Sequence, residues 1–357
     1  MRLPFVLSTD HDQGVDEVKS WLDFNNFDYS MQSFWLESQQ RFAINLAVQK
    51  HIVVWHHSIL QKFLTQAGSI DEFLRFAEQG NQLWIIGMDS ALVAMESYYN
   101  DLLHQLDSKI PYNALVMFFD AQPTVTYDLL DFEQIVVIEL KYNFFLKSRP
   151  RVQAATQHKT HAEHDFLLTM INKCNREHRD ILWRQINCRP NLVEKGIMIF
   201  HAEHSQTWLG QTQKHNPWKD GHASMDLYLD SLIEIVPETC HSDLLFFTEK
   251  SYKPIMTMTP FIMITTAGYL GYLKSLGFKT FDSLIDESYD TCEDVNDRVR
   301  QAVDLLADIV SYDTKEFYHA SKEILQHNFN NLCEISGKWQ HSFDEAMWRA
   351  FEKFACK

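Results

Sequence analysis

The sequence predicts an α/β protein of two domains with a helical C-terminal tail. Short apolar runs alternate with segments whose apolar residues recur every three or four positions, which is the pattern of strands and helices in a parallel sheet. The length of 357 residues allows two domains that share a cleft. A polar and basic stretch at 146–164 separates two halves with the same alternation. We therefore expect domains at 1–155 and 156–357.

The N-terminal half contains both kinds of element. Its helices are expected at 40–47 and 69–78, where apolar residues follow helical spacing. Its strands are expected where short apolar runs are bounded by polar or turn residues, at 51–55, 83–86, 114–119 and 134–139. Strands that alternate with helices in this way favour a parallel sheet.

The C-terminal half repeats the arrangement. Strands are expected at 166–171, 196–200 and 260–264, and helices at 176–186, 250–256 and 269–276. The tail from Val295 onward is expected to be helical throughout, because its apolar residues recur at helical spacing. No internal repeat is visible in the sequence.

Composition and charge narrow the classes of partner. The chain is 45% hydrophobic and 22% charged, without low-complexity tracts, which is typical of a folded globular protein. Its formal net charge of -16 argues against nucleic acid or an anionic membrane as a partner, because phosphate-rich surfaces are bound by basic proteins. Any phosphate-binding site must then be formed by a few basic residues close together, because the chain as a whole is acidic.

Targeting signals and cysteine spacing point to a cytoplasmic protein. No apolar run approaches the roughly 20 residues that span a bilayer, and the first residues do not resemble a signal peptide. The six cysteines are widely spaced without a CxxC pair, as expected of free thiols in a reducing compartment. We expect a bacterial or viral protein, and delivery into a host stays open.

The segment around residue 250 carries the strongest chemical signal. Glu249 and Lys250 stand between an apolar stretch at 244–247 and a helix, so Lys250 can meet a diphosphate at the helix N-terminus, where backbone N–H groups also favour anions. Glu249 can accept hydrogen bonds from ribose hydroxyls. Lys253 lies on nearly the same helical face as Lys250. An exposed ion pair at a helix start is the plainer alternative.

Several phrases around this segment resemble the fucosyltransferases of glycosyltransferase family ten and their phage, giant-virus and bacterial relatives. They are Thr248-Glu249-Lys250, LGFKTF at 276–281, IDESYD at 285–290 and NREHR at 175–179. The resemblance extends over roughly 165–332. The pair His327-Asn328 also resembles a phrase of that family, without an assigned role.

The resemblance implies a fold, an activity and a donor site. It implies a GT-B fold, in which two Rossmann-like domains face a cleft, and inverting, metal-independent transfer of a sugar from a nucleotide diphosphate, with GDP-fucose the first choice. Thr248, Glu249 and Lys250 would hold the diphosphate and ribose, with Lys253 beside them. An arginine would contact the diphosphate, Arg179 first and Arg176 second, although a solvated helix face is the alternative for both.

An inverting transfer also needs a base for the acceptor hydroxyl, which the family supplies from a carboxylate of the N-terminal domain. Asp120 follows the expected strand 114–119, and Asp89 follows the expected strand 83–86. The carboxyl ends of parallel strands are where α/β sheets collect ligands, so both are catalytic candidates. Either could instead cap the following helix.

Metal and cofactor sites are not expected. His158, His161 and His164 recur at every third position, but no HExxH motif occurs, and surface or linker histidines explain the spacing. The acidic run at 286–290 resembles a structural turn of the same family that would border the donor site, and helix capping is its plainer alternative. The expected partners are a nucleotide-sugar donor as co-substrate and a glycan or protein acceptor.

Two other functions fit the same sequence. One is a non-catalytic nucleotide-binding or scaffold protein that retains the fold, since no base motif is matched. The other is an effector or toxin that glycosylates a host protein, which differs from the first interpretation only in its acceptor.

Overall fold

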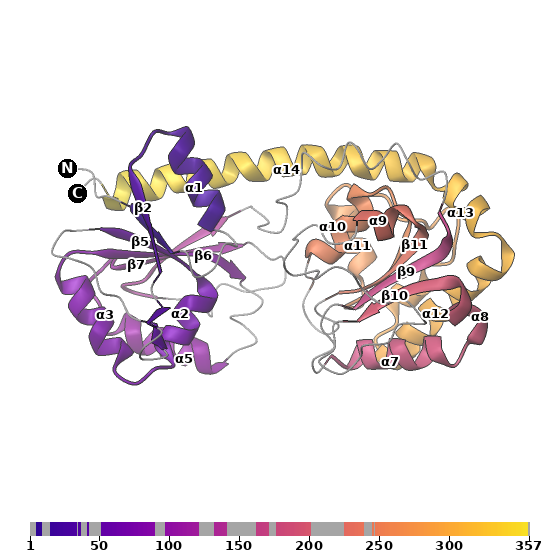
Figure 1. Ribbon diagram of the computed structural model, residues 1–357, viewed down its shortest axis with the longest axis horizontal. Coiled ribbons are helices and arrows are strands. Elements are labelled where there is room, and N and C mark those ends of the chain that lie inside the picture. The colour runs from indigo at the N-terminus through magenta and orange to yellow at the C-terminus, as the bar shows by residue number, and fades with distance from the viewer. Residues whose placement is uncertain are drawn as a thin grey trace. The chain divides into compact units, whose positions relative to one another are not determined.

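The computed structural model describes residues 5–8, 15–33, 35–36, 41–42, 51–89, 97–120, 132–140, 162–170, 176–200, 225–238, 245 and 247–355. The chain divides into two compact units (Figure 1). Unit 1 is Met1–Phe144 with Gly337–Lys357, and unit 2 is Phe145–Ser336. Among the described residues, no helix is long and apolar enough to cross a bilayer.

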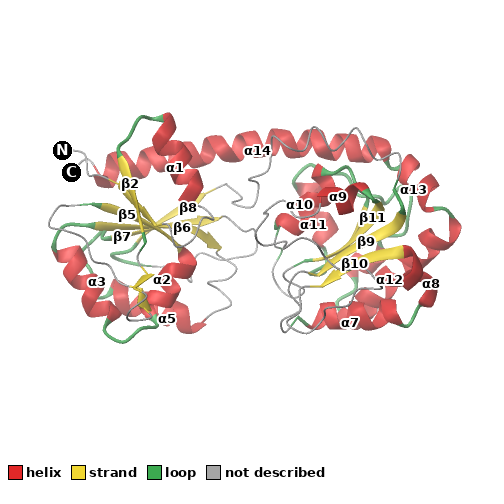
Figure 2. Ribbon diagram, viewed as in Figure 1, coloured by secondary structure: helices red, strands yellow, loops and turns green. Residues whose placement is uncertain are grey.

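Unit 1 is built on a six-stranded parallel sheet (Figure 2). Its strands, in spatial order, are β2 (Tyr29–Gln32), β1 (Phe5–Ser8), β5 (Ile52–His56), β6 (Gln82–Asp89), β7 (Leu115–Asp120) and β8 (Val136–Leu140). A short antiparallel pair, β3 (Trp35–Leu36) and β4 (Arg41–Phe42), forms a separate sheet.

Helices cover both faces of this sheet, so inner strands such as β1 and β5 are buried on both sides, as in parallel sheets generally. Alternate strand residues face opposite ways. Trp55 packs in one core with helices α2 (His57–Leu64), α3 (Ser69–Glu78) and α5 (Ser97–Asp107). Trp84 packs in the other core with α1 (Val15–Phe24) and the end of the C-terminal helix.

Unit 2 is built on a four-stranded parallel sheet in the order β10-β9-β11-β12. These strands are β9 (His164–Met170), β10 (Gly196–Phe200), β11 (Ser231–Pro237) and β12 (Phe261–Ile264). The chain passes from β9 to β10 on one side and then places β11 on the other side of β9. The strand order therefore reverses between β9 and β11.

Eight helices of unit 2 follow or flank these strands in the described residues. They are α7 (Glu177–Asn187), α8 (Pro190–Lys195), α9 (Met225–Leu229), α10 (Glu249–Met256), α11 (Tyr269–Ser275), α12 (Val295–Tyr312), α13 (Thr314–Ala320) and the start of α14 (Lys322–Ala350). A 3-10 turn at Ser288–Thr291 precedes α12, and a π-helical turn at Phe351–Ala355 follows α14.

The α/β class, the parallel sheets in both units and the helical C-terminal tail are confirmed. The predicted helix at 69–78 and strand at 196–200 match α3 and β10 to the residue. The predicted helix at 40–47 is wrong where it is described, because Arg41 and Phe42 form a strand. The proposed boundary at 155 lies outside the described residues.

The tail differs from its predicted assignment to the second domain. Helix α14 begins in unit 2, but residues from Gly337 onward belong to unit 1. Phe343, Met347 and Phe351 are spaced to share one face of the helix, and all three are buried in the core that contains Trp84. Burial of this apolar stripe explains why the end of the tail packs on the unit 1 sheet.

The first half of α14 binds a loop of unit 2 through its side chains. Asn328 is fully buried; its Oδ1 accepts from the Lys279 N–H at 2.7 Å, and its Nδ2 donates to the Lys279 carbonyl at 2.8 Å. His327 Nε2 donates to the Gly277 carbonyl at 2.9 Å, and Asn331 Nδ2 donates to the Leu276 carbonyl at 2.9 Å. The His327-Asn328 pair therefore anchors the LGFKTF segment.

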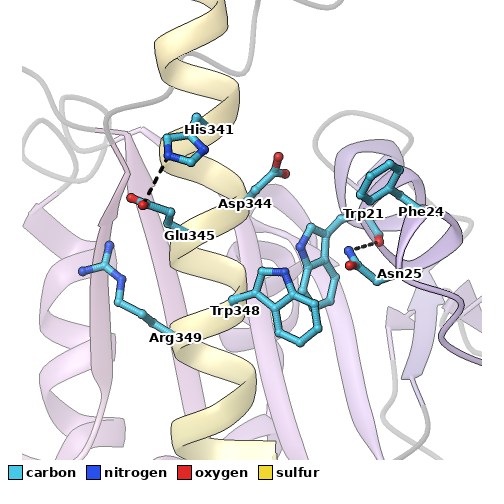
Figure 3. A pocket seen from close by; sticks show the side chains of 8 residues that line it. All are labelled: Trp21, Phe24, Asn25, His341, Asp344, Glu345, Trp348 and Arg349. Carbon is cyan, nitrogen blue, oxygen red and sulfur yellow. Dashed lines mark hydrogen bonds and ion pairs between the residues drawn. The ribbon is translucent and has the colours of Figure 1, made fainter.

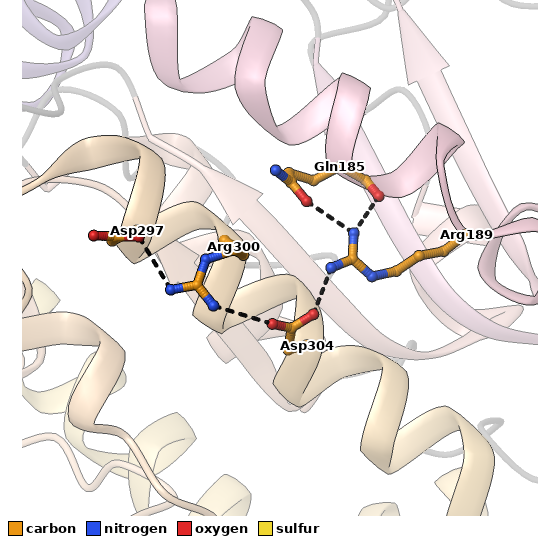
Figure 4. Close-up of polar contacts among 5 residues, drawn as sticks. All are labelled: Gln185, Arg189, Asp297, Arg300 and Asp304. Atoms are coloured by element: carbon orange, nitrogen blue, oxygen red, sulfur yellow. Dashed lines mark hydrogen bonds and ion pairs between the residues drawn. The ribbon is translucent and has the colours of Figure 1, made fainter.

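A charged network joins α12 to the end of α7 (Figure 4). Arg189 donates to Asp304 of α12 and to Gln185 Oε1 of α7, the latter at 2.9 Å. Arg300 lies between Asp304, at 3.7 Å, and Asp297, at 3.0 Å. Since each of these carboxylates is about half exposed, the network contributes orientation more than stability.

Candidate functional site

The site lies where the strand order of unit 2 reverses. In parallel α/β sheets, ligands bind beyond the carboxyl ends of the strands at such a switch point. Helix α7 is the next element after β9, and α10 is the next helix after β11. The N-terminal ends of these two helices carry the residues predicted from the sequence for donor binding.

Glu238 is the centre of this site. It directly follows β11, and its side chain is fully buried. Its Oε1 accepts from the Thr248 N–H at 3.0 Å and from the Ser251 hydroxyl at 2.7 Å. Its Oε2 lies 2.7 Å from Thr248 Oγ1, which donates to it. One carboxylate therefore holds the first turn of α10 against the end of β11.

The start of α7 contacts the backbone of the same residue. His178 Nε2 donates to the Glu238 carbonyl at 2.8 Å. Arg179 Nη2 donates to the Pro237 carbonyl at 3.2 Å and to the Glu238 carbonyl at 3.1 Å. Both side chains are buried. Glu238 thus joins α7 through its carbonyl and α10 through its carboxylate.

The α10 start is capped from within the chain. Thr248 is the N-cap, and its Oγ1 accepts from the Lys250 N–H at 3.2 Å. Lys250 Nζ lies 3.4 Å from the same oxygen. The Glu238 carboxylate complements the partial positive charge of this helix end. The Lys250 N–H is therefore already bonded, which differs from the sequence-based picture of a helix start with N–H groups open to a diphosphate.

The six predicted donor-binding residues differ in accessibility. Thr248 is 1% exposed and Arg179 is 3% exposed, so neither side chain presents much surface to a ligand. Arg176, the N-cap of α7, is half-buried. Lys250 and Lys253 are half-buried on α10. The side chain of Glu249 lies outside the described part of the structure, although its backbone begins α10.

The structure brings part of this set together. Arg179 and Thr248 both contact Glu238, and Lys250 contacts Thr248. The half-buried Arg176 stands at the start of the same helix as Arg179. Arg179 and Thr248, from the two segments that the sequence analysis singled out, therefore meet at one strand end.

The network continues into α11. The Ser251 hydroxyl lies 2.7 Å from the hydroxyl of Tyr269, which begins that helix and is fully buried. Glu238, Ser251 and Tyr269 form a buried polar chain across three elements. When every group in a buried polar chain has a hydrogen-bond partner, the chain is held in one geometry, because breaking any of these bonds would leave a polar group unpaired away from water.

The two candidate bases occupy neighbouring positions in unit 1. Asp89 ends β6 and Asp120 ends β7, and the two residues are partners in the strand register. A register shift between Ile85 and Met88 precedes Asp89. The side chains of both aspartates lie outside the described set, so neither the catalytic nor the capping interpretation is tested.

The acidic run at 286–290 caps backbone N–H groups, which is the plainer of the two roles considered from the sequence. Asp286 Oδ1 accepts from the Ser288 N–H at 2.9 Å. Glu287 accepts from the Phe281 N–H at 2.7 Å and from the Thr280 hydroxyl at 2.6 Å. Asp290 Oδ2 accepts from the Leu270 N–H at 3.0 Å. In the described residues, no three His, Cys, Asp or Glu side chains gather as a metal site.

Asp290 gives unit 2 a pH-dependent stability. Burial raises the pKa of its carboxyl from 3.8 to about 6, and the charge of Glu287 acts in the same direction. The folded state therefore keeps a proton that the unfolded state releases, so this contribution is fully present below pH 4 and is lost as the pH rises to 6. For the variant Asp290→Asn, we expect a smaller loss of unfolding free energy between pH 4 and pH 7, by up to about 3 kcal/mol.

Urea unfolding of both proteins at these two pH values measures that difference. Asp308→Asn is the matched control, since Asp308 is exposed on α12. Equal pH dependence in wild type and Asp290→Asn would contradict the prediction.

Sequence reasoning missed Glu238 and the strand that precedes it. The run SLIEIVP of β11 is buried along its whole length, and Glu234 within it hides the apolar pattern of Leu232, Ile233, Ile235 and Val236. These apolar residues, followed by Pro237 and then by the carboxylate of Glu238, are the signal that could have indicated a strand with a polar residue at its end. Of the His158, His161 and His164 series, His164 begins β9, and the other two lie outside the described residues.

Comparison with known proteins finds weak similarities to solved structures. No family model and no curated protein sequence matches the chain. The chain is similar to the DNA-modifying enzyme beta-glucosyltransferase, crystallised with and without uridine diphosphoglucose, at 10% identity over 96% of this chain and 99% of that one, with a TM-score of 0.44. It is also similar to alpha1,3-fucosyltransferase with GDP, at 10% identity over 95% and 90% of the two chains, with a TM-score of 0.37. Similarities this weak say nothing about the activity of this chain.

Proposed function

We propose that this chain is a glycosyltransferase of the GT-B type that binds a nucleotide diphosphate sugar at the carboxyl ends of β9 and β11. The observation that carries the proposal is the meeting of the α7 and α10 starts at Glu238, at the switch point of a parallel sheet. Both segments also carry the phrases that resemble family-ten fucosyltransferases.

The donor-binding roles follow from accessibility. We assign Lys250 and Arg176 to the diphosphate, because both are half-buried and basic at the two helix starts. Lys253 adds positive charge one turn along α10. Basic groups fixed here would stabilise the charge that develops on the departing diphosphate. Glu249 remains the proposed partner of the ribose hydroxyls.

Arg179 and Thr248 are proposed as positioning residues rather than donor contacts. The Arg179 guanidinium donates to two backbone carbonyls at the end of β11, and the Thr248 hydroxyl donates to Glu238. Both side chains are buried in these contacts. They hold Arg176 and Lys250 in place by fixing the helix starts that carry them.

The proposed reaction is a direct displacement with inversion. A carboxylate of unit 1, Asp89 or Asp120, takes the proton of the acceptor hydroxyl. The hydroxyl oxygen forms a bond to the anomeric carbon, and the bond from that carbon to the diphosphate oxygen breaks, so a nucleoside diphosphate leaves. GDP-fucose is the first donor to test, on the strength of the resemblance, and a glycan or a protein is the proposed acceptor.

Calorimetric titration with GDP, UDP, CDP and GDP-fucose tests the donor site. We expect one nucleotide class to bind, and we expect Lys250→Ala and Arg176→Ala each to weaken it about tenfold or more, since a charge-assisted hydrogen bond contributes roughly 1.5–3 kcal/mol. Lys315→Ala is the matched control, because Lys315 is exposed on α13, and it should bind as wild type does.

The same preparations separate binding from turnover. Asp89→Asn and Asp120→Asn should keep nucleotide affinity, and one of them should abolish acceptor-dependent release of GDP from GDP-fucose. If well-folded protein binds none of the nucleotides, the proposed donor site is wrong. If it binds one nucleotide tightly but both aspartate variants behave as wild type with every acceptor, the proposed base is wrong.

A further inference from the structure

Unit 1 contains a pocket that the proposed transfer reaction does not use. It has a volume of about 630 Å³ and lies between α1 and the last turns of α14 (Figure 3). All of its lining residues belong to unit 1. The volume is within the range of pockets that hold small organic ligands.

Aromatic rings form one wall of the pocket. The indoles of Trp21 and Trp348 meet edge to face, with centroids 5.2 Å apart. Trp348 is 38% exposed, and Phe24 at the rim is 85% exposed. Aromatic faces carry partial negative charge, so they attract the weakly positive C–H groups of a saccharide ring and shed water from them. An exposed indole next to a pocket is therefore a suitable platform for a sugar.

A buried hydrogen-bond donor in this wall has no partner. Trp21 is 4% exposed, and its Nε1 makes no hydrogen bond within the described part of the chain. Figure 3 draws this nitrogen on the side of the indole that faces α14. An unsatisfied buried donor costs roughly 1–3 kcal/mol, and an indole N–H can only donate. A ligand oxygen in the pocket would remove that cost.

The α14 side of the pocket, which also carries Trp348, supplies acceptors and one cation. Asp344 is half-buried; its Oδ1 accepts from Gln340 at 3.2 Å, and burial raises the pKa of this carboxyl. Glu345 Oε1 lies 3.3 Å from His341 Nε2, and the exposed Arg349 lies one residue beyond Trp348. Charges of both signs line the pocket, which suits an uncharged ligand with many hydroxyl groups better than a phosphate or a carboxylate.

We propose that this pocket binds a neutral saccharide, with one sugar ring on Trp348, a ligand oxygen accepting from Trp21 Nε1, and hydroxyl groups donating to Asp344. All residues of this site belong to unit 1, and the proposal holds whether or not the chain transfers sugar. A second copy of the chain covering Phe24 and Trp348 is the competing occupant.

Saturation-transfer NMR and tryptophan fluorescence with lactose, N-acetyllactosamine and chitobiose test this proposal. We expect at least one of these disaccharides to bind, with Trp348→Ala lowering its affinity about tenfold and Trp21→Phe, which keeps a ring but removes the donor, lowering it by a smaller factor. Asp344→Ala should also weaken binding. Tyr312→Ala is the matched control, because Tyr312 is an aromatic residue 83% exposed on α12, and it should leave binding unchanged.

Three outcomes would overturn the proposal. The first is that none of the three disaccharides binds the folded protein. The second is that a disaccharide binds, but Trp348→Ala and Trp21→Phe bind it as wild type does. The third is that sedimentation shows a dimer of wild type that Trp348→Ala converts to monomer, which would assign the surface to a second copy. Nucleotide affinity, measured in parallel, should be the same in all pocket variants, so failure here is distinguishable from failure of the donor site.

Discussion

Glu238→Ala is expected to lower the unfolding free energy of unit 2 by roughly 3–5 kcal/mol and to abolish nucleotide binding. The change leaves the Thr248 N–H, the Thr248 hydroxyl and the Ser251 hydroxyl without their acceptor in a buried place. Each such group costs roughly 1–3 kcal/mol. Lys250 loses its position as well, because the start of α10 is fixed to β11 by this carboxylate.

Glu238→Gln separates the two parts of that expectation. The amide oxygen can still accept from Ser251 and the Thr248 N–H, and the amide nitrogen can donate to the Thr248 hydroxyl. We expect a loss of roughly 1–2 kcal/mol and weakened but measurable binding. Urea unfolding gives the stabilities, and hydrogen exchange at the α10 amides shows whether the helix start is loosened.

The control for both variants is Glu194→Ala, at an exposed position on α8. It should match wild type in stability and in binding. A Glu238→Ala protein as stable as this control would show that the buried network contributes nothing, and the positioning role of Glu238 would have to be abandoned.

Asp107→Ala is expected to destabilise unit 1 by roughly 3–5 kcal/mol. Asp107 lies at the end of α5 and is 7% exposed. Its carboxylate accepts from three consecutive backbone N–H groups that lead into β8, those of Glu133 at 2.9 Å, Gln134 at 2.8 Å and Ile135 at 2.7 Å. Alanine leaves all three without an acceptor, and hydrogen bonds to a charged group are the stronger kind.

Nucleotide affinity of the Asp107→Ala protein should stay at the wild-type value wherever the protein is folded, because the proposed donor site lies in unit 2. Asp101→Ala, at an exposed position on the same helix, is the control for stability. Thermal unfolding followed by circular dichroism measures both variants. An unchanged transition for Asp107→Ala would mean that water replaces the carboxylate at little cost.

The elements that sequence reasoning predicted well have unbroken patterns. Helix α3 shows Phe73, Phe76 and Ala77 at helical spacing, and all three are buried. Strand β11 was missed because the buried Glu234 interrupts its apolar run. The Glu234 carboxyl accepts from the hydroxyl of Tyr228, which is close in sequence but belongs to another element. In a sequence, a buried glutamate with a local partner looks like a surface residue until the fold is known.

The candidate site shows a similar division. Thr248, Glu249 and Lys250 could be found from adjacent residues, because a helix start is a local feature. Glu238 is separated from Thr248 by nine residues, and the hydrogen bonds that join them exist only in the folded chain. The spacing of Arg176 and Arg179 places both on one helix face, so it could not show which guanidinium contacts the carbonyls of β11 and which stays accessible.

The path of α14 has a consequence for the order of synthesis and folding. The core of unit 1 that contains Phe5 and Trp84 is completed by Phe343, Met347 and Phe351. These residues leave the ribosome after all of unit 2, so unit 1 holds an open apolar surface while the rest of the chain is being made. Contacts between residues so distant in sequence form slowly, and exposed apolar surface invites aggregation in the meantime. Unit 2 is continuous in sequence and does not need a later segment to complete its core. The unit whose synthesis begins first is therefore the one that finishes folding last.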